Sequence, residues 1–365
     1  MAEYLTNTTD LTKVADAIRT KGGTSAALAY PDEYVSAINA ITTGTELKIV
    51  VSVPTGATVT ATKGGLSVSG ISANGTCTLV VPEAGTWSVN ATLNGQTSNT
   101  KSVSIVDSYA LTLSFATSTL NDNEWSVIKT VSDAGEGANY WSIGDRKAVV
   151  LNGTVGALSL SNVTTYAFII GFNHNSSVEG SNRIHFQLAK TALSGGTDIA
   201  FCGDYFYMNS SETNSGGWRA SQMRTNICGT SLSSYSGTII AVIPAALRAV
   251  LKSVTKYTDN TGGGSSASAI SATTDYFFLL SEYEVFGTTL CANDYESSKQ
   301  KQYDYYSAGN SKIKYMHRSP STAVFWLLRS PYANYSDRFT GVSPNGRING
   351  SMANYSAGLA PGFCV

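Results

Sequence analysis

The stretch that decides the fold of the last domain is residues 325–365, FWLLRSPYANYSDRFTGVSPNGRINGSMANYSAGLAPGFCV. It opens and closes with apolar runs, 325–328 and 359–365, which are typical of strands or turns anchored in a core. Between them, residues 332–357 are mainly Asn, Tyr, Ser, Gly, Asp and Arg, with Phe339, Val342 and Ile348 as expected anchors. Tyr offers rigid contact area and the small polar residues offer adaptable hydrogen bonding, so this composition favours a ligand-binding surface. A polar surface loop on a β-rich domain is the alternative.

Three motifs in this stretch carry a resemblance: WLLRSP (326–331), NG (345–346) and GLAPGFC (358–364). They resemble the C-terminus of variable proteins that are diversified by diversity-generating retroelements. The resemblance implies a C-type-lectin-like fold and a variable region of about residues 329–358. It also implies that errors at adenines convert asparagine codons into codons for Tyr, Ser, Asp, Gly, Ala, Arg, Ile, Phe or Thr.

Thirteen residues fit this codon pattern, and we call them the candidate face. They are Tyr332, Ala333, Asn334, Tyr335, Ser336, Asp337, Arg338, Asn349, Gly350, Ser351, Asn354, Tyr355 and Ala357. We expect their side chains to be exposed on one continuous surface, because a substituted position contributes little to a core. Met352 does not fit the pattern: either its template codon is different or the position is not a target.

Composition limits the classes of partner. The chain has 365 residues, enough for two or three domains, and a charged fraction of only 13% with a formal net charge of -1. Nucleic-acid binders concentrate Lys and Arg, so no nucleic-acid partner is expected. The sequence has neither an apolar run of membrane-spanning length nor a secretory signal, which predicts a protein without membrane insertion.

The cysteines and acidic residues predict neither a metal site nor catalysis. The five cysteines are odd in number and form no CxxC pair, so we expect buried free thiols, with a Cys202–Cys228 bridge as an open alternative. Asp275, Glu282, Glu284, Asp294 and Glu296 are interpreted as surface charges or partners of Arg329 and Arg318, with an incidental ion site as the alternative. The Glu-Pro-Asn, Gln-Pro-Asp and Trp-Asn-Asp motifs of calcium-dependent lectins do not occur. No cofactor is expected.

An enzyme is considered because one branch of the C-type-lectin-like fold contains the formylglycine-generating enzymes. Such enzymes need reactive cysteines in a pocket with a metal. Cys291 and Cys364 have no histidine nearby in sequence. We therefore expect a protein that is not an enzyme, although residues distant in sequence can still meet in space.

The chain before the last domain predicts two smaller units. Residues 10–41, within a predicted segment 1–45, carry two short helical patterns with apolar stripes. They resemble the opening of phage structural proteins, which implies a virion attachment segment; a helical cap on the next domain is the alternative. Residues 46–115 hold β-rich runs separated by turn signals, which predicts a small β-sandwich that resembles Ig-like spacers. Sugar binding through Trp87 is a minor alternative.

Residues 116–365 are predicted to form the C-type-lectin-like domain, with few helices and an irregular sheet. Strands are expected across 125–145, 166–172 and 184–188, and 277–287 is expected to be a buried element. The glycine-rich run 262–266 is interpreted as a flexible loop, because it lacks the Lys-Ser/Thr of a phosphate-binding loop. The whole chain is therefore predicted to be an α+β, β-rich multidomain protein.

The leading hypothesis is a hypervariable receptor-binding protein at the tail tip of a phage or prophage of a Firmicutes host. It would bind a host cell-surface protein or glycan through the candidate face and tail or baseplate proteins through its N-terminus. By analogy with the family it would be a homo-oligomer, with a trimer favoured, made in the bacterial cytoplasm and located in the virion. The alternatives are a surface-displayed or secreted cellular adhesion protein and a structural tail protein without diversification.

Overall fold

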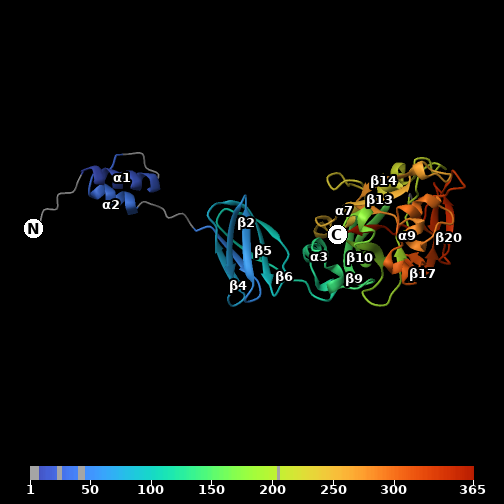
Figure 1. Cartoon of the computed structure of the whole chain (residues 1–365), viewed down its shortest axis with the longest axis horizontal. Helices are drawn as coiled ribbons and strands as arrows, with labels where there is room; N and C mark the ends of the chain where they lie inside the picture. Colours follow the sequence, from blue (N-terminus) through green and yellow to red (C-terminus); the bar gives the residue numbers. More distant parts are fainter. Residues whose placement is uncertain (1–7, 23–26, 40–45, 204–205) are drawn as a thin grey trace, which may run out of the picture. The chain divides into compact units, whose positions relative to one another are not determined.

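The computed structural model describes residues 8–22, 27–39, 46–203 and 206–365 (Figure 1). The chain divides into two compact units. One contains the described residues up to Asn94 together with Lys101–Leu113, and the other contains Gly95–Thr100 and Ser114–Val365. The protein is β-rich, with several sheets and few, mostly short helices. In the described part of the chain, no helix combines the length and apolarity that a membrane crossing requires.

Two helices form the described part of the N-terminal segment, α1 (Thr8–Gly22) and α2 (Asp32–Asn39). Ala15 and Ile18 of α1 pack with Tyr34 of α2, and the Tyr34 hydroxyl donates a hydrogen bond of 2.6 Å to the backbone oxygen of Leu11. The two apolar stripes therefore bury part of their surface against each other. Residues 1–7, 23–26 and 40–45 of the predicted segment 1–45 lie outside the described residues.

A β-sandwich follows, built on alternating apolar residues. Its sheets have the strand orders β4-β1-β8 and β3-β2-β5, with β7 also paired to β5. Trp87 is fully buried in β5, and its indole nitrogen donates to the Glu83 oxygen at 3.1 Å. The alternative of sugar binding through Trp87 was therefore wrong. The strands of this region are β1 (Lys48–Ser52), β2 (Thr58–Lys63), β3 (Leu66–Ile71), β4 (Thr76–Val80), β5 (Gly85–Leu93), β6 (Gln96–Thr97), β7 (Lys101–Ile105) and β8 (Ser108–Thr112).

The second unit is organised on a five-stranded antiparallel sheet with the order β15-β21-β11-β10-β9. The last strand of the chain, β21, lies between β11 and β15 and pairs Phe363 with both Phe186 and Phe277. The C-terminal apolar run is therefore part of the central core, as the sequence predicts. The strands are β9 (Arg146–Val155), β10 (Leu158–Phe172), β11 (Ile184–Lys190), β15 (Phe277–Phe278) and β21 (Gly362–Cys364).

A separate three-stranded antiparallel sheet carries the C-terminal polar stretch: β18 (Trp326–Pro331), β19 (Arg338–Val342) and β20 (Ile348–Met352). Every residue of β18 is buried, and β19 is buried from Phe339 onward. β20, at the edge, keeps all five residues exposed or half-exposed. The expected burial of Trp326, Leu328 and Val342 is confirmed, and Trp218, Phe278, Leu280 and Phe363 join them in one core.

One stretch differs from its predicted secondary structure. Residues 125–145 were expected to be strand, but they begin with the helices α3 (Trp125–Asp133) and α4 (Gly137–Tyr140). Trp125, Ile128 and Val131 recur every third residue and face the core, which is a helical period. The aromatic and β-branched residues that favour strands outweighed this period in the sequence interpretation.

Shorter elements complete the second unit. The strands are β12 (Ile199–Ala200), β13 (Val254–Asp259), β14 (Ile270–Asp275), β16 (Lys314–Met316) and β17 (Ser319–Val324). The helices and helical turns are η1 (Leu120–Asp122), α5 (Ser176–Glu179), α6 (Gly217–Ala220), η2 (Met223–Cys228), α7 (Ile239–Val242), α8 (Ala245–Arg248), η3 (Ala267–Ala269), α9 (Glu282–Phe286), η4 (Asp294–Ser298) and α10 (Asp304–Ser307).

Candidate ligand-binding face

All residues of the candidate face lie in the described part of the chain, and all are exposed or half-exposed. Asn334, Tyr335, Ser336, Asn349, Asn354 and Tyr355 are exposed, and Tyr332, Ala333, Asp337, Arg338, Gly350, Ser351 and Ala357 are half-exposed. They come from β19, from β20, from the β18–β19 connection and from the segment after β20. The core residues Phe339 and Thr340 interrupt them and are fully buried.

Contacts among the side chains join the β18–β19 connection to the sheet. The rings of Tyr332 and Tyr335 meet edge to face, with centroids 5.0 Å apart, and the guanidinium of Arg338 lies 4.6 Å from the Tyr335 ring. A hydrogen bond with the Cys291 thiol is the main reason that the pKa of Tyr332 rises to about 12. These three side chains form a compact aromatic and cationic patch, which is the composition of binding hot spots.

Positions 332 and 350 are coupled by direct contact. A Cβ atom built on Gly350 would lie 2.5 Å from the Tyr332 ring, closer than real Cβ contacts come. The contact is with a side chain, so the ring can move aside without a shift of the backbone. Any residue larger than glycine at 350 therefore requires a displaced or smaller side chain at 332.

The backbone of the β18–β19 connection is held from outside by Asn214. The Asn214 amide nitrogen Nδ2 donates to the backbone oxygens of Tyr332, Tyr335 and Arg338, at 3.3, 2.7 and 2.9 Å. Its own backbone N–H donates to the Ser336 oxygen at 2.8 Å. Because these bonds reach only backbone atoms, they fix the loop whatever side chains the loop carries.

Two further loops hold Ala333. Its N–H donates to the Cys291 oxygen at 2.7 Å, and its oxygen accepts from the Gly264 N–H at 2.5 Å. The Cys291 loop is held by the buried Glu282 carboxylate, which accepts from three successive backbone N–H groups at 2.5 to 3.0 Å. The glycine-rich run was interpreted as a flexible loop, but two of its N–H groups are engaged, since Gly262 also donates to Asp259 at 3.0 Å.

Replacing Asn214 with Ala should loosen the loop without unfolding the domain. The loop oxygens lose their common donor, and the expected cost is about 1–3 kcal/mol of stability. Hydrogen exchange at the Tyr332 and Tyr335 amides, which bond within this loop, should become faster. The matched control is Asn226→Ala, at an exposed asparagine elsewhere. Unchanged exchange in the Asn214 variant would show that the clamp does not hold the loop.

Beneath the face, buried charges join β18 to the rest of the core. The Arg329 guanidinium is fully buried and pairs with both carboxylate oxygens of Glu284, at 2.5 and 3.0 Å. Lys256 bonds to Glu284 and Glu179, at 2.8 and 2.7 Å. Burial opposes ionisation of Glu284, but Arg329 and Lys256 outweigh it and lower its pKa. Burial raises the pKa of Glu179 to about 7.

The predicted partnership of Arg329 with an acidic residue is confirmed for Glu284. The other part of that interpretation, a surface charge, holds for Asp294 alone, and it was wrong for Asp275, Glu282 and Glu296. Asp275, Glu282, Glu284 and Glu296 are fully buried, and only Asp294 is exposed. Their burial is possible because each carboxylate accepts hydrogen bonds or pairs with a cation.

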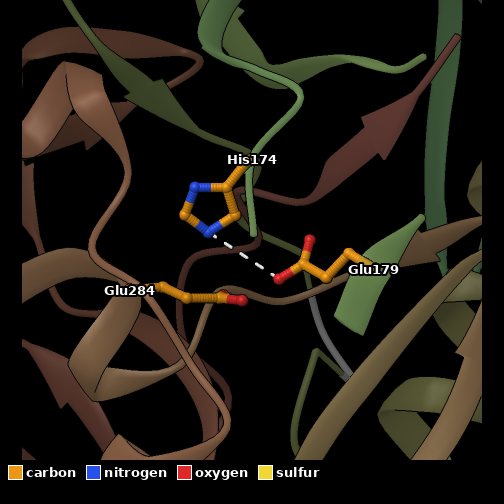
Figure 2. A group of neighbouring side chains, drawn as sticks. All are labelled: His174, Glu179 and Glu284. Atoms are coloured by element: carbon orange, nitrogen blue, oxygen red, sulfur yellow. Dashed lines mark ion pairs between the residues drawn. The ribbon is translucent and has the colours of Figure 1, made fainter. Parts of the chain in front are cut away.

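One group of side chains has the composition of a metal site. Figure 2 shows His174, Glu179 and Glu284 pointing toward one another, with the His174 Nε2 atom 3.7 Å from the Glu179 carboxylate. The Lys256 ammonium, however, lies within 2.8 Å of both carboxylates and takes the place a cation would need. Burial lowers the pKa of His174 to about 3. Lys256 thus neutralises the two carboxylates, whereas neither ring nitrogen of the neutral His174 has a hydrogen-bond partner.

The thiols are arranged for packing. All five cysteines are free; Cys77, Cys228 and Cys364 are buried, whereas Cys202 and Cys291 are half-buried, so the expectation of burial fails for those two. The fold does bring a histidine to Cys364: its sulfur lies 3.3 Å from the His185 Nδ1 atom, a contact that sequence spacing could not reveal. Burial raises the pKa of Cys364 to about 12 and lowers the pKa of His185 well below its usual value. This pair therefore holds a neutral thiol rather than a nucleophilic thiolate.

Comparison with known proteins gives one match. Residues 197–365 match the model of a domain of unknown function, DUF6273. The comparisons with curated proteins and with solved structures give no match.

The matched segment contains the candidate face and the residues that hold it, Asn214, Glu282 and Arg329. It begins after β9, β10 and β11, which nevertheless share the central sheet with β15 and β21. The compact unit is therefore larger than the matched segment, and a protein made for experiments should begin before Gly95.

Proposed function

We propose that this chain is a hypervariable ligand-binding protein at the tail tip of a phage or prophage, and that it recognises a host surface molecule through the candidate face. One observation carries the proposal. Every residue of the face is accessible, and Asn214 holds the backbone beneath it through hydrogen bonds to backbone oxygens, which do not depend on the side chains of the face. A surface built in this way tolerates exchange of its side chains without loss of the fold.

The proposal includes an architecture. The second unit is a C-type-lectin-like domain in which the sheet β18-β19-β20 displays the face, the sandwich is an Ig-like spacer, and the N-terminal helices attach the chain to tail or baseplate proteins. Several copies, with a trimer favoured, would sum weak contacts into avidity. The fully buried β18, joined to the core through the Arg329–Glu284 pair, supports a rigid display of the neighbouring strands.

The test replaces the three tyrosines of the face, Tyr332, Tyr335 and Tyr355, with Ala. Binding of the labelled chain to a panel of Firmicutes cells should be abolished, because rigid aromatic residues dominate binding energy at such surfaces. Stability should fall by only about 1 kcal/mol, with most of the loss at the half-buried Tyr332.

The matched control replaces three exposed tyrosines outside the face, Tyr30, Tyr109 and Tyr295, with Ala. This control should bind the same cells as the parent. If the variant that lacks Tyr332, Tyr335 and Tyr355 binds the cells as well as the parent does, the ligand site lies elsewhere, and the proposal is wrong.

A further inference from the structure

A pocket of about 310 Å³ lies at one edge of the candidate face. Two residues of the face, Tyr355 and Ala357, line it together with residues of other segments. Tyr355 is 66% exposed, the most exposed tyrosine of the described residues. Met316, Ala323, Val324 and Phe325, which precede the variable region in the chain, also line the pocket.

The walls differ in origin. Tyr355 and Ala357 fit the adenine-derived codon pattern, whereas Met316 and Val324 belong to the β16–β17 hairpin, outside the variable region of about 329–358. The Phe325 ring packs against Gly341 of β19, where a Cβ atom would have no room. The backbone N–H of Gly358 also donates to the Phe325 oxygen at 2.8 Å. One side of the pocket is therefore constant and belongs to the scaffold.

The lining selects for an apolar occupant. Among the described residues, none that line the pocket carries a charge, and most contribute carbon atoms of Met, Val, Phe, Pro and Ala. Burial raises the pKa of Cys202, which also lines the pocket, to about 11, so its thiol stays neutral. Few of the lining side chains can hydrogen-bond, Tyr355 and Ser356 among them, so a sugar with its many hydroxyls would lose more hydrogen bonds to water than an aromatic or aliphatic side chain would.

We propose that this pocket is a constant subsite that takes one aromatic or aliphatic side chain of a polypeptide ligand. This inference rests on the proposed function and deepens it, because it identifies the ligand as a host surface protein. The volume is large enough to admit a large side chain, and binding energy at interfaces concentrates where such an anchor enters a pocket. The variable residues around the pocket would then choose among ligands that share the anchor.

Small probes test the pocket without knowledge of the ligand. The probes are p-cresol and indole, which stand for Tyr and Trp side chains, and N-acetylglucosamine, which stands for a glycan. The readout is the methyl NMR signals of Met316, Val324 and Ala357 in the whole chain. We expect p-cresol and indole to shift these signals at millimolar concentrations, and N-acetylglucosamine to leave them unchanged.

A filling substitution links the pocket to ligand recognition. Ala323 lines the pocket from β17, so Ala323→Phe should abolish the methyl shifts and weaken binding to Firmicutes cells by roughly tenfold or more. The matched control is Thr164→Phe, which adds the same ring at an exposed position of β10 that does not line the pocket and should change neither readout.

Each contrary outcome has a distinct meaning. Methyl shifts with N-acetylglucosamine alone would replace the polypeptide ligand with a glycan and overturn the inference. If no probe shifts the methyl signals of the parent protein, the inference is overturned, and no variant is needed to decide this. If the parent binds the aromatic probes but Ala323→Phe still binds cells normally, the pocket takes no part in ligand recognition, and the inference is overturned as well. Failure of the proposed function appears elsewhere, as normal cell binding by the triple tyrosine variant of the face.

Discussion

Replacing Arg329 with Ala should lower the free energy of unfolding by about 3–5 kcal/mol, the range observed when one partner of a buried ion pair is removed. Arg329 is fully buried in β18, and its guanidinium also bonds to Thr258 and to the Leu279 oxygen, at 2.7 and 2.9 Å. In the variant, Lys256 is the remaining cation that pairs with the buried Glu284 carboxylate, and Lys256 also pairs with Glu179. Urea unfolding of the whole chain measures the loss.

The control for this prediction is Arg338→Ala, which removes a half-exposed guanidinium from the next strand and should change stability by less than about 0.5 kcal/mol.

The pH dependence of the stability adds a second check. The pKa of Glu284 is lowered in the folded state, so its pairing stabilises the fold above the ordinary value of 4.5 and is lost as pH falls further. The difference between parent and Arg329→Ala should therefore narrow in acid. Equal stability of the two proteins at neutral pH would contradict the network.

Replacing Trp326 with Ala should lower the free energy of unfolding by about 3–5 kcal/mol, the usual range for a buried large aromatic residue. Trp326 is fully buried at the start of β18, and its indole nitrogen donates to the Lys312 oxygen at 2.9 Å. The Lys314 ammonium, itself buried, lies 5.1 Å from the ring. The substitution therefore leaves a cavity, removes a hydrogen bond and exposes a buried cation to that cavity.

Tyr355→Ala is the control for the Trp326 substitution, because it truncates a large aromatic residue that is mostly exposed. It should melt within a degree or two of the parent, since exposed positions contribute little to folding. Thermal unfolding of the whole chain compares the three proteins. If the Trp326→Ala protein melts at the same temperature as Tyr355→Ala, then β18 is not part of the core that supports the face.

The features that the sequence predicted are those carried by local pattern. Short alternating runs with turn signals predicted β1, β2, β4, β5 and β7 of the sandwich, and apolar runs predicted the burial of Trp326 and Phe363. The positions of the face came from the codon pattern that the resemblance implies, and all of them are exposed or half-exposed. β3, with its small and polar residues, carried too weak a pattern and was missed.

The features that the sequence could not predict depend on contacts between distant segments. Asn214 lies more than a hundred residues before the loop whose oxygens it binds, and a single asparagine carries no local signal. The burial of Glu284 also depends on partners that the fold supplies, namely Lys256 and Arg329. Periodicity reports which face of an element is apolar, but it does not report which buried polar groups will meet.

The measurement that tests the central claim most directly is the sequence of the DNA flanking the gene. We expect a near-copy of the codons for about residues 329–358, beside a reverse transcriptase gene, with differences confined to adenines of the copy. These differences should fall on codons of the candidate face and spare those of the buried Phe339, Thr340 and Val342. The absence of such a copy, or differences spread equally over buried and exposed positions, would contradict diversification of this face.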